Sequence, residues 1–133
     1  MKEEELLNDG KRFHGHLGPY LALGLKAGLL AKEHLKATPF KMKANLTLKL
    51  EKPVSCFIDG VQVASGCTMG KRNITAVEGT GISALFSTEG GSLRMRVKDE
   101  TLAWINSLHV TKENEEEISR QVMQKPYGEL FEY

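Results

Sequence analysis

Hydrophobic and polar residues alternate most regularly between residues 42 and 51. Met42, Ala44, Leu46, Leu48 and Leu50 are separated by Lys43, Asn45, Thr47, Lys49 and Glu51. A period of two predicts a half-buried β-strand with one face in water. Shorter segments at 74–77, 83–87 and 93–98 predict three more strands, with turns between them at 78–81 and 88–91.

A longer spacing predicts helices elsewhere in the chain. Pro19 suits the first turn of a helix that we expect to continue to about Lys36, because the N–H that proline lacks is unpaired there anyway. Leu21, Leu25 and Gly28 share the face that we expect to be buried, and Lys26 marks the solvent side. Other helices are predicted at 3–9, before a loop at 10–18, then from Cys56, with Ser55 as N-cap, to Gly66, and at 99–108 and 112–124.

The order of these elements predicts an α+β fold, with helices at both ends of a small antiparallel sheet. The 133 residues suffice for one domain, so we treat 1–133 as a single unit. Hydrophobic residues make up 41% and charged residues 26%, which is typical of a globular protein. A net charge of +1 argues against bulk electrostatic binding to nucleic acid or to an anionic membrane.

The N-terminal segment is acidic and contains no apolar stretch, so we expect no secretory signal. The longest apolar-rich run, 20–31, is interrupted by Lys26 and is too short to span a bilayer. We therefore expect a cytoplasmic protein. In that compartment two cysteines favour a metal or redox pair over a structural disulfide, and two inert buried thiols are the alternative.

Two histidines bracket a glycine just before the long helix, in the segment Phe13-His14-Gly15-His16. Imidazole is the commonest neutral metal ligand and the side chain that titrates closest to pH 7. Gly15 would let the loop bend so that at least one ring points inward. His-x-His is a weak signal alone, so a metal or catalytic role and a plain structural role both stay open here.

The two cysteines flank a predicted helix. A ten-residue helix is about 15 Å long, so Cys56 and Cys67 need not share one site, and their spacing is not that of a zinc knuckle. At the start of the helix we expect the helix dipole to lower the pKa of Cys56. Asp59, one turn on, could support a histidine ligand or could simply be a first-turn acid that favours the helix dipole, and Gln62 extends the same polar line.

The loop that follows, Gly66-Cys67-Thr68-Met69-Gly70-Lys71, lacks the spacing of a Walker phosphate loop. Lys71 and Arg72 could still hold an anionic ligand, and a solvated loop is the alternative.

These segments resemble two motifs of the FmdE family, which takes its name from formylmethanofuran dehydrogenase. The family carries His-Gly-His-x-Cys-Pro-Gly before a long helix, and here the segment runs from His14 to Tyr20. It also carries Cys-x-x-Asp-Ala-Ile-Gln…Gly-Cys-Thr-x-Gly-Lys, which matches 56–71 in order and spacing. One departure matters: Gly18 stands where the family motif has a cysteine, so one thiolate is missing. A cysteine-rich zinc finger that many larger members carry has no counterpart after Cys67.

The resemblance implies a mixed, largely antiparallel sheet packed against helices, and a homodimer with a cleft near the two motifs. It implies a site for a divalent transition metal, with zinc as the default and nickel or iron as alternatives. A partner metalloenzyme is also implied. The residues carried over are the metal ligands His16, Cys56, Cys67 and His14 and the site-lining Asp59, Gln62, Thr68 and Lys71.

Three functions follow from these observations. The first is a metal-binding protein accessory to a formylmethanofuran dehydrogenase-type or other metalloenzyme. The second is a small metal- or thiolate-dependent enzyme of unknown reaction, with His16 as an acid–base group. The third is a purely structural component of a larger assembly, with cysteines that are inert.

Overall fold

A five-stranded sheet with the strand order β2-β1-β3-β4-β5 forms the framework of the computed structural model, which describes residues 2–133. Its strands are β1 (Lys43–Leu48), β2 (Ile74–Glu78), β3 (Ile82–Thr88), β4 (Gly91–Val97) and β5 (Phe131–Glu132). β1 and β2 run parallel, whereas every other neighbouring pair is antiparallel. The predicted α+β class with a mixed, largely antiparallel sheet is therefore confirmed.

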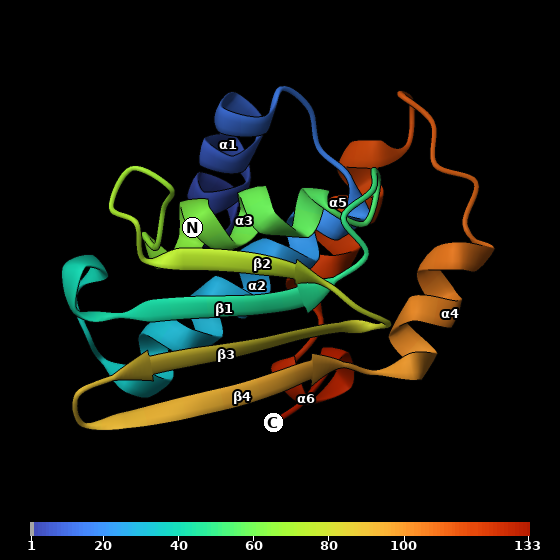
Figure 1. The fold of residues 1–133 in the computed structure, drawn as a ribbon. Coiled ribbons are helices and arrows are strands. Elements are labelled where there is room, and N and C mark those ends of the chain that lie inside the picture. Colours follow the sequence, from blue (N-terminus) through green and yellow to red (C-terminus); the bar gives the residue numbers. More distant parts are fainter. Residues whose placement is uncertain (1) are drawn as a thin grey trace.

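The helices gather mainly on one face of this sheet (Figure 1). They are α1 (Lys2–His14), α2 (Pro19–Leu35), η1 (Pro39–Lys41), α3 (Cys56–Ser65), α4 (Asp99–Ser107), α5 (Glu115–Gln124) and α6 (Tyr127–Leu130). α2 and α3 lie behind the sheet in this view, and α4 closes its right-hand end. No helix within residues 2–133 is both long enough and apolar enough to cross a membrane.

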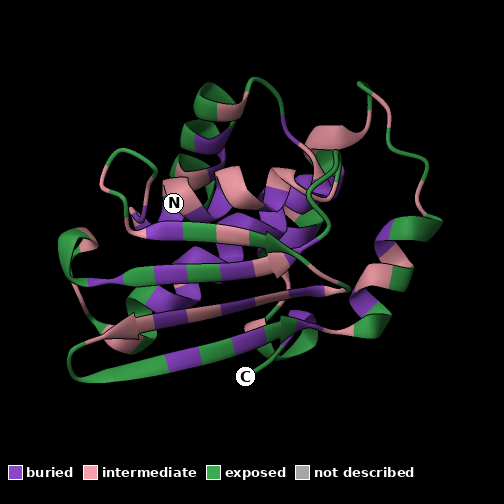
Figure 2. Ribbon diagram, viewed as in Figure 1, coloured by how far each residue is buried: buried purple, intermediate pink, exposed green. Residues whose placement is uncertain are grey.

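Alternating burial along β1 explains its place in the sheet. Ala44, Leu46 and Leu48 are buried, while Lys43 and Asn45 are exposed, and Figure 2 shows the same alternation on the neighbouring strands. The strand is shorter than predicted because Leu48 is its last residue to pair with β2 and β3. The chain then turns toward α3, which leaves Leu50 45% exposed instead of buried.

The two central helices touch backbone to backbone. An added Cβ at Gly24 of α2 would lie 2.1 Å from the carbonyl oxygen of Phe57 in α3. One at Gly60 of α3 would lie 2.2 Å from the carbonyl oxygen of Leu21. Only glycine fits at either position, so this contact fixes where the first turn of α3 lies relative to α2.

Lys26 was predicted to face solvent but is buried, with 6% of its surface exposed. Its ammonium donates to the carbonyl oxygen of Met123 at 3.0 Å and lies 4.5 Å from the centre of the Tyr127 ring. α5 and α6 cover this side of α2, so a carbonyl at the end of α5 and an aromatic ring replace the water that the lysine would otherwise bind.

Helix ends agree with the sequence in part. Gly66 ends α3 with a φ of 79°, as predicted, but the Ser55 side chain makes no capping hydrogen bond. The predicted loop at 10–18 is wrong for its first part, since α1 continues to His14. Gly10 is buried against α2, where an added Cβ would lie 3.1 Å from Leu25 Cδ1, and this packing extends the helix.

Candidate functional site

The two histidines lie at the junction of α1 and α2. His14 is the last residue of α1, and Gly15 follows with a φ of 111°, a left-handed conformation that favours glycine. This turn brings the His16 ring back beside the His14 ring, with 4.8 Å between ring centroids and an interplanar angle of 46°. The side chain of His14 is largely covered, at 12% exposed, whereas that of His16 is 60% exposed.

Both imidazoles have their Nδ1 atoms held by oxygen acceptors. His14 Nδ1 lies 2.6 Å from Oδ2 of Asp59, and His16 Nδ1 lies 2.8 Å from the carbonyl oxygen of Leu17. A carbonyl oxygen can only accept, and a carboxylate does the same, so Nδ1 carries the proton in each ring. A neutral ring protonated at Nδ1 keeps a lone pair on Nε2.

α3 contributes Cys56 and Asp59 to the region of the two histidines. Cys56 is the first residue of α3 and lines the cavity that the histidines line. Burial, followed by the negative charge of Asp59, raises the pKa of the Cys56 thiol, and Lys52 offsets only part of this effect. The predicted lowering of its pKa is therefore wrong, because desolvation and a neighbouring carboxylate outweigh the helix end.

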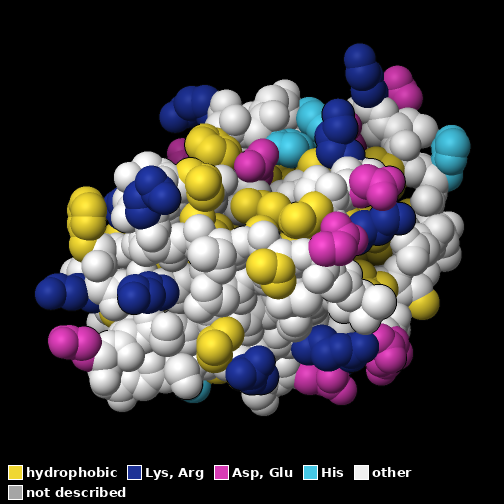
Figure 3. All heavy atoms as spheres, in the orientation of Figure 1, with side chains coloured by type: hydrophobic (Ala, Val, Ile, Leu, Met, Phe, Trp, Pro, Cys, Tyr) yellow, Lys and Arg dark blue, Asp and Glu magenta, His cyan; other side chains and the backbone are white. Residues whose placement is uncertain are grey.

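A cavity of about 360 Å³ opens beside these side chains. Its walls are mainly apolar and come from the start of α2, the 53–56 segment, the end of α4 and the chain that follows it. The lining residues are His14, His16, Leu17, Gly18, Pro19, Tyr20, Leu21, Pro53, Val54, Cys56, Ile105, Asn106, Leu108, Val110 and Glu115. Figure 3 shows histidine side chains in the upper part of this view, with exposed hydrophobic side chains below and to the left of them.

Three polar residues of this cavity were missed by the sequence reasoning. Tyr20 follows the histidine motif directly, so its position next to Pro19 was the available signal. Its hydroxyl donates to Oδ1 of Asn106 at 3.2 Å. Glu115 falls within the helix predicted at 112–124, and its side chain is only 18% exposed and lies 3.6 Å from His16 Nδ1. Nothing local in the sequence signals the positions of Asn106 and Glu115.

The other predicted site residues lie toward the opposite end of α3. Cys67 is fully buried, and its thiol contacts the carbonyl oxygen of Met42 at 3.5 Å. Gln62 accepts from the Met69 N–H, and the Thr68 hydroxyl accepts from the Lys71 N–H. None of these residues lines the cavity of His14 and Cys56. The structure thus brings together four of the eight predicted residues, His14, His16, Cys56 and Asp59.

As the side chains stand in residues 2–133, no three His, Cys, Asp or Glu residues converge closely enough to hold one metal ion. The donor types themselves suit a transition metal, with two imidazoles held by oxygen acceptors and one thiol in the wall of the same cavity. His16 is the most exposed histidine of the set, with 60% of its side chain exposed.

Comparison with known proteins agrees with this arrangement of motifs. A probable S-adenosyl-L-methionine-binding protein from Archaeoglobus fulgidus is 30% identical over an alignment of length 136 that covers 91% of this chain. The match spans 37% of that relative, so its name describes a much longer protein. The family described as "FmdE, Molybdenum formylmethanofuran dehydrogenase operon" matches residues 13–132, which include both motifs. The chain belongs to the FmdE family.

Proposed function

We propose that this chain is a metal-binding FmdE-family protein whose ligands are His14, His16 and Cys56. The observation that carries the proposal is the pair of Nδ1 hydrogen bonds, to Asp59 and to the Leu17 carbonyl oxygen. They leave Nε2 of both rings as the atom able to bind a metal. A carboxylate or carbonyl behind a histidine is the usual support of a metal ligand, since it fixes the tautomer and the ring orientation.

The donor set favours zinc, with nickel and iron as alternatives, because imidazole and thiolate suit all three ions. Three protein ligands would leave a coordination position for water or for a ligand molecule. Cys67 has no part in this set, because it is buried at the other end of α3.

A metal bound here would supply Lewis acidity at the edge of an apolar cavity. The protein's own residues would set its surroundings. Asp59 would hold the His14 ring, and Val54 and Ile105 in the cavity wall would limit the access of water. Because the family description names a molybdenum formylmethanofuran dehydrogenase operon, we extend the proposal to an accessory role for such an enzyme or another metalloenzyme.

Metal content measured by elemental mass spectrometry tests the proposal. Untagged protein would be reconstituted anaerobically with zinc, nickel or iron and then desalted. We expect about one metal ion per chain in the wild type, and loss of most of it in His14→Ala, His16→Ala and Cys56→Ser, since each removes one of three ligands.

Cys67→Ser is the matched control, because it removes the other thiol while keeping a group able to donate to the Met42 carbonyl oxygen. It should retain wild-type metal content. Circular dichroism would establish that every variant is folded. A wild type that takes up none of the three metals would refute the proposal, and equal losses in Cys56→Ser and Cys67→Ser would refute the assigned ligand set.

A further inference from the structure

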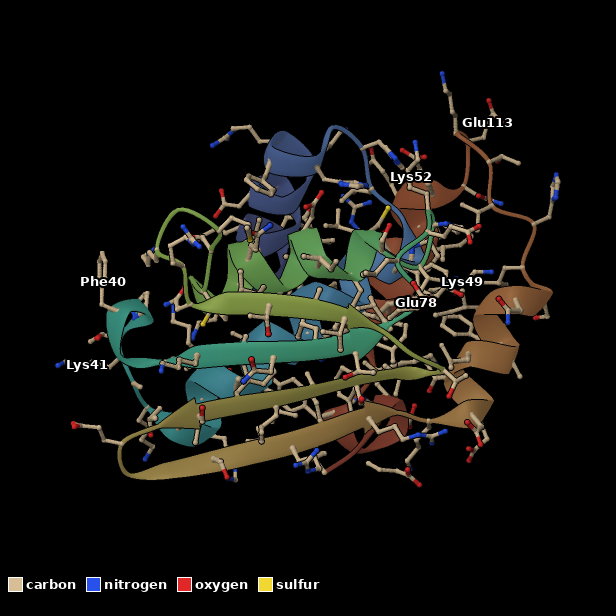
Figure 4. All side chains as sticks on the ribbon, in the orientation of Figure 1. Phe40, Lys41, Lys49, Lys52, Glu78 and Glu113 are labelled. Carbon is tan, nitrogen blue, oxygen red and sulfur yellow. The ribbon has the colours of Figure 1, made fainter. Side chains whose placement is uncertain are left out.

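A second cavity of about 480 Å³ lies at the carboxyl ends of the parallel strands β1 and β2. Ile82 and Leu102 give it apolar walls, and Thr80 lies in the turn that borders it. Figure 4 shows Lys49 and Glu78 side by side at these strand ends, next to α4. The region outside the carboxyl ends of parallel strands is a common place for ligands to bind.

The second cavity adjoins the first. Tyr20, Val54 and Asn106 line both, and the Tyr20 hydroxyl donates to Asn106 Oδ1 at 3.2 Å. These three side chains therefore form the boundary between the two cavities. Val54 continues the apolar surface from one to the other, and the Tyr20–Asn106 pair is the polar group at the boundary.

We propose that the two cavities form one elongated binding site for a linear, uncharged small molecule with an amide group near its middle. One end would lie beside His14 and Cys56, the amide would cross the boundary, and the other end would lie between Ile82 and Leu102. The position of the first end rests on the proposed function, whereas the path across the boundary rests on the two cavities alone.

The charges at the second cavity explain why an uncharged chain fits. Lys49 lies 3.7 Å from Glu51, and Glu78 accepts from the Leu50 N–H at 3.1 Å. Both charged groups lining this cavity therefore already have partners, and their signs are opposite. A ligand with a net charge would gain little there, because opposite charges on its walls largely cancel.

The Tyr20–Asn106 pair explains why we place an amide at the boundary. Asn106 accepts from Tyr20, and in residues 2–133 its Nδ2 donates no side-chain hydrogen bond. The phenolic oxygen of Tyr20 still has lone pairs that can accept. A ligand amide can complement either group, since its carbonyl oxygen can accept from Asn106 Nδ2 or its N–H can donate to the Tyr20 oxygen.

N-butylhexanamide, a linear uncharged amide, is a suitable probe for metal-free protein, with binding followed by ¹⁵N–¹H NMR. We expect shifts at the amides of Leu17 and Gly18 in the first cavity and of Thr80 and Gly81 in the second. Lys41, at the opposite end of the molecule (Figure 4), should not respond.

Two variants test the path of the chain. Thr80→Trp should fill the second cavity, and Asn106→Leu should remove the hydrogen-bond donor, and each should weaken binding about tenfold. Val77→Trp is the control, because Val77 is exposed like Thr80 but lies on β2 and lines neither cavity.

Shifts confined to one cavity, or a Thr80→Trp affinity equal to that of wild type, would overturn the inference. Because the titration uses no metal, its failure is distinct from failure of metal binding, which elemental analysis of the same preparations measures.

Discussion

Replacing Gly60 with alanine tests whether the contact between α2 and α3 positions the site. The added Cβ would lie 2.2 Å from the carbonyl oxygen of Leu21 and 2.6 Å from the backbone N of Leu25. Both atoms are helical backbone and cannot rotate away, so the two helices must separate. Overpacking of this kind costs about 1–3 kcal/mol, occasionally more, and the helix propensity of alanine returns about 1 kcal/mol. With backbone on both sides, we expect a net loss of about 2 kcal/mol.

Urea and thermal unfolding of Gly60→Ala would measure this loss. For a domain of this size, 2 kcal/mol corresponds to a fall in Tm of about 8 °C. Gly128→Ala is the matched control, since Gly128 also lies in a helix and an added Cβ there meets nothing within 4 Å. If Gly60→Ala unfolded within about 0.5 kcal/mol of wild type, which is the usual range for a surface change, the close approach of the helices would be refuted.

The same variant links packing to the site. α3 carries Cys56 and Asp59, whereas His14 and His16 precede α2. Separation of the helices would move the thiol and the carboxylate away from the imidazoles. We therefore expect Gly60→Ala to bind zinc more weakly than Gly128→Ala under conditions where both are folded.

Three further predictions concern the site residues. Asp59→Asn keeps an oxygen that can accept from His14 Nδ1 but removes the negative charge. Zinc affinity, measured by chelator competition, should therefore fall about 10- to 100-fold. An unchanged affinity would exclude a role for the carboxylate. Iodoacetamide followed by mass spectrometry should modify Cys56 in the native protein and the fully buried Cys67 only after unfolding; modification of Cys67 first would contradict the fold. Burial raises the pKa of the Cys67 thiol above its ordinary value of 9.0. As the pH rises, the unfolded protein therefore loses the thiol proton at a lower pH than the folded protein does. The free energy of unfolding, measured by urea titration, should therefore decline above about pH 9. The decline should be smaller in Cys67→Ala, and an equal pH dependence in the two proteins would refute the role of Cys67.

Local signals predicted the elements whose environment is set by near neighbours. The alternation in 43–48 identified β1 because its inward side chains pack under helices along one whole face. The limits of α3 followed from Cys56 and Gly66, since a glycine with positive φ is a common helix end. The parallel pairing of β1 with β2 could also have been predicted, because α3 forms the crossover that parallel strands require.

Contacts between distant segments produced the errors. Lys26 reads as a solvent-facing residue of α2, but α5 and α6 cover it from about a hundred residues further along the chain. Asn106 and Glu115 reach the cavity through the packing of α4 and α5, and no nearby pattern marks them. The spacing of the two cysteines did not decide whether they share one site. In the structure α3 separates them, and only Cys56 lines the cavity of the histidines.

Gly18 offers a direct test of the departure from the FmdE motif, which has a cysteine at this position. Gly18 lines the cavity with His14 and Cys56, and its φ of −176° is extended backbone that any residue adopts. An added Cβ meets nothing within 4 Å. Gly18→Cys should therefore fold normally and present a second thiol at the site.

If the site binds metal as proposed, this second thiol gives it a fourth protein ligand, because four-coordinate zinc is readily completed by thiolate. We expect Gly18→Cys to bind zinc at least about tenfold more tightly than wild type, a gain of about 1.4 kcal/mol. Gly18→Ala controls for the loss of glycine, and the double variant Gly18→Cys, Cys56→Ser should return to roughly wild-type affinity. Equal zinc affinity in Gly18→Cys and Gly18→Ala would mean that position 18 does not face the metal, and the cavity would then need a different ligand set.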